Sequence, residues 1–167
     1  PGFNDAHCHF LAYCRGTEEL QLFGTSSKIE VRKKLKKFAC KNKKRKWIVG
    51  RGWDQNNWEV QEFPNFEDLN GATKIPTCLS RVDGHAIWLN KAALEHLKLN
   101  YDTIIIGGEI LKLSNGQASG VFIDNAADWI QDMIPDMDED VMIKALKCGT
   151  EDLLKSGITS ISEAGLS

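Results

Sequence analysis

The chain opens with Pro1-Gly2-Phe3-Asn4-Asp5-Ala6-His7-Cys8-His9. Side chains at positions i and i+2 of a β-strand point to the same face, so a strand here would project His7 and His9 together, with Asp5 on that face as well. The neutral nitrogens of two imidazoles are suitable ligands for zinc or a similar divalent ion. Two histidines separated by one residue also occur by chance. The pair alone therefore leaves two interpretations open, a metal site and two surface histidines.

The composition is that of an ordinary globular protein. The 167 residues are 42% apolar and 26% charged, with a formal net charge of -2, which excludes collagen-like, mucin-like and wholly disordered chains. No apolar run approaches the roughly 20 residues of a membrane-spanning helix, and the first residues lack the apolar core of a secretory signal. We therefore expect neither a membrane protein nor a visible preprotein. Because the chain begins without Met and ends just after a strand-like run, we also expect a piece of a longer protein.

The five cysteines do not form a disulfide or zinc-finger pattern. They are odd in number, scattered along the chain and never arranged as C-x-x-C. Free thiols are the usual state of cysteines in the reducing cytoplasm. The sequence therefore predicts a cytoplasmic protein whose cysteines are small core residues: Cys8, Cys14, Cys40, Cys78 and Cys148.

Positive charge is concentrated in one segment. Residues 28–46 contain eleven basic residues and a single acidic residue, Glu30, whereas the rest of the chain is acidic. Apolar residues at helical spacing predict an amphipathic helix over residues 28–40, with Ser27 and Glu30 as a capping box. A basic helix can bind phosphate backbones, but no aromatic residue is interleaved to stack on bases. We therefore expect a solvated basic face and no nucleic-acid partner.

The remaining pattern predicts a mixture of strands and helices. Asn115-Gly116 indicates a type I′ turn between two strands, Asn90 is placed to cap a helix, and Ser156-Gly157 to end one. The expected strands are residues 47–53, 77–82, 109–113, 118–123 and 158–161, and the expected helices are residues 91–97, 124–133 and 136–155.

Five stretches, in order, resemble motifs of one enzyme family. They are similar to motifs of the amidohydrolase superfamily, in its family-3 branch, which includes formamide-deformylase-like enzymes. Residues 1–9 resemble P-G-[FL]-[IV]-D-x-H-x-H, residues 47–54 W-I-x-G-x-G-W-[DN], residues 81–94 R-x-[DS]-G-H-x-x-W-[VL]-N-x-x-A-L, residues 108–124 a G-G-E-I…G-V-[LF]-x-[DE] hairpin, and residues 157–165 G-[VI]-T-S-[VI]-x-[DE]-A-G.

The resemblance implies a metal-dependent hydrolase, about three times longer than this chain, built as a (β/α)₈ barrel with catalytic groups at the carboxyl ends of its strands. His7 and His9 would be ligands of a divalent metal, with zinc expected, and the other ligands and the proton shuttle would lie outside this chain. The implied fold class is α+β, an insertion unit flanked by two strands of a truncated TIM barrel. Residues 1–10 would be the first barrel strand, 11–156 the insertion and 157–167 the second barrel strand.

Other polar residues are weaker candidates for the site. His85, after Asp83-Gly84, could reach a substrate or make a structural hydrogen bond to a neighbouring loop. Glu163 follows the last expected strand, where a barrel would place an active-site group, and His96 is expected at the surface. Trp53 and Trp58 could form a ligand-contacting edge, although large aromatic residues are more often core.

These observations lead to one expected function and one alternative. We expect the N-terminal part of an amidohydrolase that cleaves amide-like C–N bonds of a small-molecule substrate with metal-activated water, inactive as an isolated chain. Its terminal strands would have unpaired edges and could mediate self-association. The alternative is a non-catalytic binding module that uses the loop 53–58 or the basic helix of residues 28–46.

Overall fold

The computed structural model describes residues 1–165 and divides into two compact units. Unit 1 comprises Pro1–Glu19 and the chain from Asp136 onward, and unit 2 comprises Leu20–Pro135. From the sequence we expect an insertion over residues 11–156, and that division stays a prediction. In the structure, the helices next to the terminal strands belong with those strands. Leu166 and Ser167, the end of the expected second barrel strand, lie outside the described residues.

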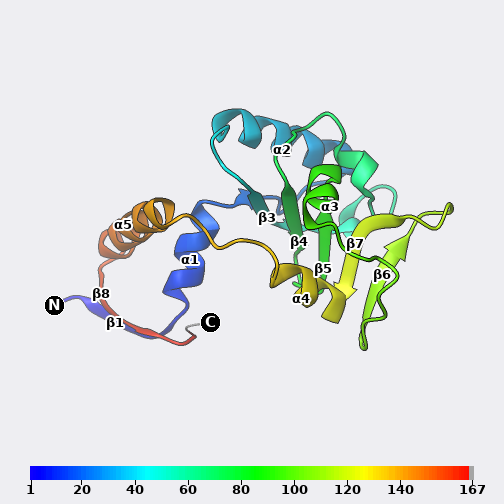
Figure 1. Ribbon diagram of the computed structural model, residues 1–167. Helices are drawn as coiled ribbons and strands as arrows, with labels where there is room; N and C mark the ends of the chain where they lie inside the picture. Colours follow the sequence, from blue (N-terminus) through cyan, green and yellow to red (C-terminus); the bar gives the residue numbers. More distant parts are fainter. Residues whose placement is uncertain (166–167) are drawn as a thin grey trace. The chain divides into compact units, whose positions relative to one another are not determined.

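Unit 1 is a pair of parallel strands with two helices (Figure 1). Its elements are β1 (Phe3–Cys8), α1 (Phe10–Thr17), α5 (Glu139–Lys155) and β8 (Ile158–Glu163). The register pairs Phe3 with Ile158 and Cys8 with Glu163, so the carboxyl ends of both strands lie at the same edge. Many strand side chains are exposed, including Phe3 at 73%. A parallel pair is usually covered on both faces, and within residues 1–165 these two strands form a sheet of their own.

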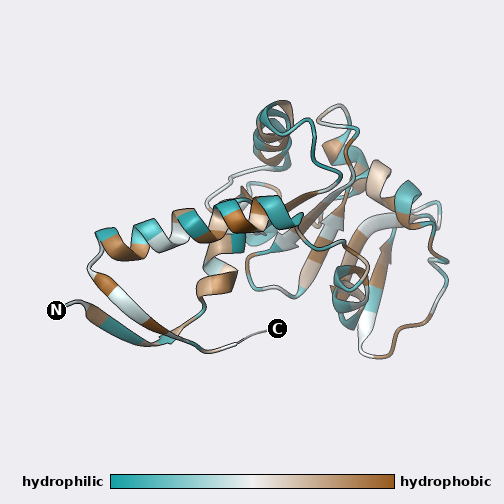
Figure 2. Cartoon of the chain, turned by 60° about the vertical axis from the view of Figure 1, so that its left-hand side comes forward, coloured by the Kyte–Doolittle hydropathy of each residue, from teal (hydrophilic) through white to brown (hydrophobic). Residues whose placement is uncertain are grey.

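The boundaries of α5 follow from charge and backbone freedom. Glu139 and Asp140 occupy its first turn, where carboxylates interact favourably with the positive end of the helix dipole. Gly157 has φ of +79°, a conformation that glycine adopts without steric cost, and it leads the chain into β8. Apolar and polar residues alternate along the helix (Figure 2). The apolar side packs on α1, where Cys14 and Ala145 are fully buried.

Unit 2 is built on a six-stranded mixed sheet with the order β2-β3-β4-β5-β7-β6. The first three strands are parallel and the rest are antiparallel to their neighbours. The strands are β2 (Leu20–Gln21), β3 (Ile48–Trp53), β4 (Thr77–Arg81), β5 (Ala86–Leu89), β6 (Gly108–Lys112) and β7 (Ala118–Asp124). The helices are α2 (Lys28–Lys41), α3 (Lys91–Leu97) and α4 (Asn125–Gln131), with short 3₁₀ turns η1 (Gln55–Asn57) and η2 (Phe66–Leu69).

The tryptophans of unit 2 form the centre of its core. Trp53, Trp58 and Trp88 are at most 3% exposed, and their ring centroids lie 5.8–6.3 Å apart. The indole nitrogen of Trp53 donates to the Leu79 carbonyl, and that of Trp88 donates to the Asn65 carbonyl. Trp53 and Trp58 therefore form no exposed ligand-contacting edge, and they are core residues of unit 2.

Helix α2 matches the predicted amphipathic helix closely. Val31, Leu35 and Ala39 are buried, while the basic residues lie mainly on the exposed side. The Ser27 hydroxyl accepts a hydrogen bond from the Glu30 amide, as expected for a helix cap. The reciprocal bond differs, because the Glu30 carboxylate accepts from the amide and hydroxyl of Ser26 instead. These bonds lower the pKa of the Glu30 carboxyl group.

The hairpin between β6 and β7 corrects one turn prediction. Gly116 has φ of +83°, but Asn115 is not among the residues with positive φ, so the turn is not type I′. The Gly116 amide donates to the Leu113 carbonyl, and the Leu113 amide donates to the Gln117 carbonyl. This is a three-residue loop in which glycine follows a type I turn. The Asn115 side chain accepts from the Gln117 amide and stabilises that geometry.

The structure shows the burial and the oxidation state of the five cysteines. All five cysteines are free thiols; Cys14 and Cys78 are buried as expected, whereas Cys40 and Cys148 are exposed and Cys8 is half-buried. Burial is the main cause that raises the pKa of the Cys14 thiol.

In the part of the chain that the structure describes, every helix is too short or too polar to span a lipid bilayer.

Two glycine-to-alanine substitutions test the contact between α1 and α5 in unit 1. A Cβ added at Gly149 would overlap the sulfur of Cys14 and lie 3.1 Å from the Phe10 ring, whereas one added at Gly16 meets open space. Gly149→Ala is expected to lower the free energy of unfolding by about 1–3 kcal/mol through overpacking. Gly16→Ala, the control in α1, should instead be neutral or stabilise by up to about 1 kcal/mol. Urea unfolding followed by circular dichroism measures both, and equal effects would contradict the packing.

Candidate active site

The two predicted metal ligands lie together at the carboxyl end of β1. His7 is in the strand, and His9 follows it as the first residue before α1. Their ring centroids are 5.3 Å apart and the rings are nearly perpendicular. Both side chains are exposed, and the His7 amide donates to the Asp5 carboxylate. The geometry agrees with the expectation that the i, i+2 spacing brings the two imidazoles to one face.

Glu163 is the last residue of β8, and its carboxylate binds a backbone amide at the start of α1. Its Oε2 accepts a hydrogen bond from the Leu11 amide at 3.1 Å, and its Oε1 accepts from the Gly165 amide and lies 4.0 Å from His9 Nδ1. The amide of Leu11 is the main cause that lowers the pKa of the Glu163 carboxyl group. His9 provides no side-chain cap for α1, so Glu163 satisfies amides that the helix start would otherwise leave unpaired.

These residues fit part of a metal site. Within residues 1–165 no group of three or more His, Cys, Asp and Glu side chains is arranged to hold a metal ion. Cys8 lies between the two histidines, and side-chain alternation along β1 directs it to the opposite face. Burial and the neighbouring Asp5 and Glu163 carboxylates raise the pKa of its thiol. A hydrolytic zinc usually has three protein ligands. His7 and His9 are two side chains where such a centre needs three, and their role as metal ligands stays a prediction.

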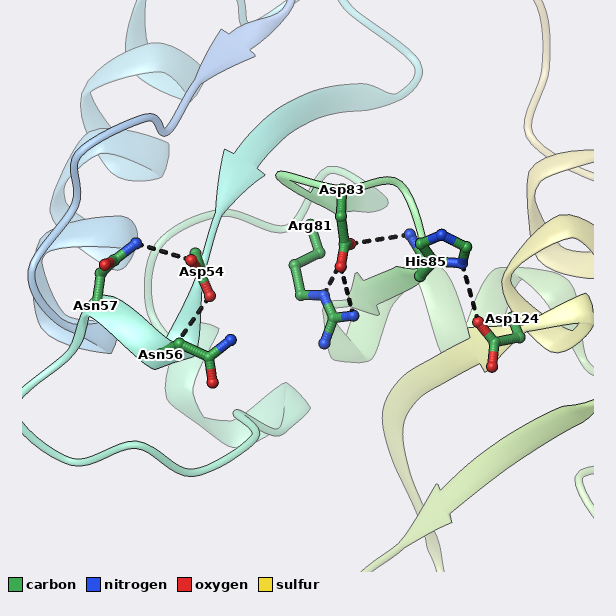
Figure 3. A network of polar contacts seen from close by, with 7 residues as sticks. All are labelled: Asp54, Asn56, Asn57, Arg81, Asp83, His85 and Asp124. Carbon is green, nitrogen blue, oxygen red and sulfur yellow. Dashed lines mark hydrogen bonds and ion pairs between the residues drawn. The ribbon is translucent and has the colours of Figure 1, made fainter.

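A second polar cluster lies at one edge of the sheet in unit 2, formed by residues from three neighbouring strand ends (Figure 3). Arg81 closes β4 and binds the Asp83 carboxylate through two nitrogens at 2.9 and 2.7 Å. Asp83 also accepts from the His85 amide, and its contacts, chiefly with Arg81, lower its pKa. The His85 Nδ1 lies 3.0 Å from the carboxylate of Asp124, the last residue of β7.

Two further histidines that the sequence suggested, His85 and His96, both lie in unit 2. His85 makes the structural hydrogen bond that was one of its two interpretations, yet its side chain is 68% exposed. His96 lies on α3 with its ring against Trp47, at 5.4 Å between centroids. Sequence reasoning missed Asp124 as the partner of His85, because the two residues are 39 positions apart. The sequence did contain one signal for Asp124, because the hairpin motif ends with an acidic residue at that position.

Comparison with known proteins identifies the family. A sequence profile of the amidohydrolase family matches residues 1–167. YtcJ of Bacillus subtilis (strain 168), which bears an amidohydrolase name, is 30% identical over 161 residues, covering 95% of this chain and 30% of YtcJ. The Arabidopsis thaliana protein LONG AFTER FAR-RED 3 is 28% identical over 169 residues, covering 99% of this chain and 28% of the plant protein.

Solved structures agree with this assignment. A metal-dependent hydrolase from Pyrococcus horikoshii OT3 matches with a TM-score of 0.71 and 25% identity, over 98% of this chain and 32% of that one. A second, from Pyrococcus furiosus, shares the fold with a TM-score of 0.70 and 22% identity, over 98% of this chain and 33% of that one. The chain belongs to the amidohydrolase superfamily. Within it, the chain is a member of the family-3 branch, and it spans less than a third of the length of these two sequence relatives.

Proposed function

We propose that this chain is the N-terminal part of a metal-dependent hydrolase that cleaves amide-like C–N bonds of a small-molecule substrate. The observation that carries the proposal is the pair of adjacent imidazoles at the carboxyl end of β1, beside the carboxyl end of its parallel partner β8. Barrel enzymes place catalytic groups at that end of their strands. In this proposal β1 and β8 are the first two strands of a (β/α)₈ barrel, and unit 2 is the insertion between them.

The residues of unit 1 have distinct roles in this proposal. His7 and His9 would hold a divalent ion, with zinc expected. When bound, the ion would lower the pKa of a water molecule toward neutrality and polarise the scissile carbonyl. Glu163 holds the start of α1 through the Leu11 amide and lies beside His9. Its carboxylate is occupied by backbone amides, so we assign it to fixing the position of His9 and not to proton transfer.

The exposed strands support the view that more of the protein covers unit 1. Phe3 in β1 is 73% exposed, and several residues of β8 are exposed as well. Since two histidines are fewer than the three ligands of a hydrolytic zinc, we propose that the chain alone is inactive. Self-association through the edges of β1 and β8 is the expected behaviour of such strands without the rest of the barrel.

Substitution of His7 tests the metal site. In the longer protein that this proposal requires, His7→Ala should lower zinc affinity more than about 100-fold, because even changes to outer-shell partners cost about 10–100-fold. His96→Ala is the control, since its ring contacts Trp47 on unit 2. Metal content after dialysis, measured by plasma emission spectrometry, reports both variants.

The isolated chain gives the complementary result. With two imidazole ligands it should bind zinc no tighter than about micromolar. Stoichiometric zinc at submicromolar affinity in this chain, abolished by His7→Ala, would show that the site is complete without further strands. If the longer protein hydrolyses amides and its His7→Ala variant keeps the metal, then His7 is not a ligand of that metal.

A further inference from the structure

Asp124 has a backbone conformation that is unusual for its residue type. Its φ is +49° and its ψ is -127°. Among the non-glycine residues that the structure describes, positive φ occurs only here and at Lys98. Glycine adopts such angles without steric cost, whereas a side chain there is strained and persists only where the surroundings hold it. The strain indicates that the carboxylate at position 124 has a use that glycine could not provide.

The carboxylate is not used to cap the helix that follows it. Asp124 is the N-cap residue of α4, but its side chain makes no capping hydrogen bond. Its Oδ1 lies 3.0 Å from His85 Nδ1, and its amide donates to the His85 carbonyl at 2.8 Å. Both the backbone and the side chain of the strained residue are therefore directed to His85.

The loop that carries His85 is held from its other side as well. The His85 amide donates to Asp83, and Asp83 is bound by the forked guanidinium of Arg81, whose side chain is 15% exposed (Figure 3). The backbone and Nδ1 of His85 thus have fixed partners. The side chain nevertheless remains 68% exposed. Such a histidine is positioned rigidly while its ring stays accessible.

The partner of Nδ1 determines what the ring can offer. An ionised carboxylate only accepts hydrogen bonds, so in the neutral imidazole the proton is on Nδ1 and Nε2 is an acceptor. We propose that His85 is a ligand-binding residue of unit 2 whose Nε2 accepts a hydrogen bond from an amide N–H, and that Asp124 is its positioning residue. The amide class of the ligand rests on the proposed function, whereas the roles of the two ring nitrogens do not.

Nuclear magnetic resonance of the chain labelled with ¹⁵N-histidine tests the positioning role. In the wild type, His85 should show protonated Nδ1 and unprotonated Nε2. Asp124→Gly and Asp124→Ala should both lower the ratio of these tautomers about tenfold. Asp124→Gly should also raise the midpoint of thermal unfolding above that of Asp124→Ala, because only glycine relieves the backbone strain. An unchanged tautomer ratio in both variants would overturn the positioning role.

Titration with two small amides tests the contact itself. N-methylacetamide has an N–H donor and N,N-dimethylacetamide does not. The first should shift the His85 ring resonances in the wild type and not in Asp124→Ala, while the second should leave them in place; His96 serves as the internal control. Equal shifts with both amides, or no shift with either, would overturn the assignment of His85. Because this experiment needs neither metal nor hydrolysis, its failure is distinct from failure of the metal test on His7.

Discussion

Trp53→Ala is expected to lower the free energy of unfolding of unit 2 by about 3–5 kcal/mol. The indole is fully buried between Trp58 and Trp88, and its nitrogen donates to the Leu79 carbonyl in β4. Alanine would leave a large cavity and remove the hydrogen bond from the indole to the Leu79 carbonyl in the centre of the sheet. Since a domain is stable by only about 5–15 kcal/mol, the loss would remove a large part of that stability. Urea unfolding followed by tryptophan fluorescence and circular dichroism measures it.

Two phenylalanine substitutions separate packing from hydrogen bonding. The indole nitrogen of Trp58 is buried without a hydrogen-bond partner among residues 1–165, so Trp58→Phe removes packing atoms but no hydrogen bond seen in the structure. Trp53→Phe removes the bond to Leu79 and should cost about 1–3 kcal/mol more. If Trp58→Phe were the more destabilising of the two, the hydrogen-bond assignment in this core would be wrong.

The parts of the fold that could be predicted from the sequence are those governed by local chemistry. The spacing of Val31 and Leu35 placed α2 to within a residue of its observed end. Asn90 caps α3 by accepting from the Ala93 amide, and the same side chain accepts from Thr77, a contact that no local pattern indicates. Capping and amphipathic periodicity involve residues three or four positions apart, so they are visible in the sequence.

The missed elements depend on tertiary contacts. Strand β5 has only four residues and is buried on both sides, so it shows no alternation. Helix α1 begins without a side-chain cap of its own, because Glu163 supplies the acceptor from 152 positions away. The hairpin turn was misassigned because an Asn-Gly pair suits both a type I′ turn and a type I turn followed by glycine. For β5 and α1 the deciding partners are distant in sequence, whereas the hairpin turn depends on which residues of the two adjacent strands pair.

The candidate site divides in the same way. The His7 and His9 pair was predictable because two residues of one strand determine it. Asp124 was only a motif position until the structure paired β5 with β7 and brought it to His85. Glu163 stays a prediction as a site residue, and its principal contacts are backbone amides at the start of α1. Residue type and spacing thus indicated which residues could carry chemistry, and tertiary pairing shows what each carboxylate contacts.

Leu35→Ala is expected to lower the free energy of unfolding of unit 2 by about 2–5 kcal/mol. Leu35 is fully buried in the core on which α2 packs, together with Val31 and Ala39. One position further, Lys36 is exposed, as is Lys43 beyond the helix. Replacing these two lysines by glutamate should change stability by less than about 0.5 kcal/mol, because surface substitutions away from caps and ion-pair networks seldom do more. Urea unfolding of the three proteins compares the two faces of α2.

The same charge reversal tests the binding alternative. If the basic face is only solvated, no duplex or single strand should bind tightly at physiological salt, although any polyanion will be attracted weakly at low salt. Fluorescence anisotropy at about 150 mM salt measures this, and a specific complex would have a dissociation constant of about 10 nM or below. Tight, sequence-selective binding that is lost in the Lys36→Glu, Lys43→Glu variant while folding is retained would make α2 a nucleic-acid contact. If Leu35→Ala lowers stability and no such binding is found, then α2 is a scaffold element. Its apolar face alone would in that case account for its place in the fold.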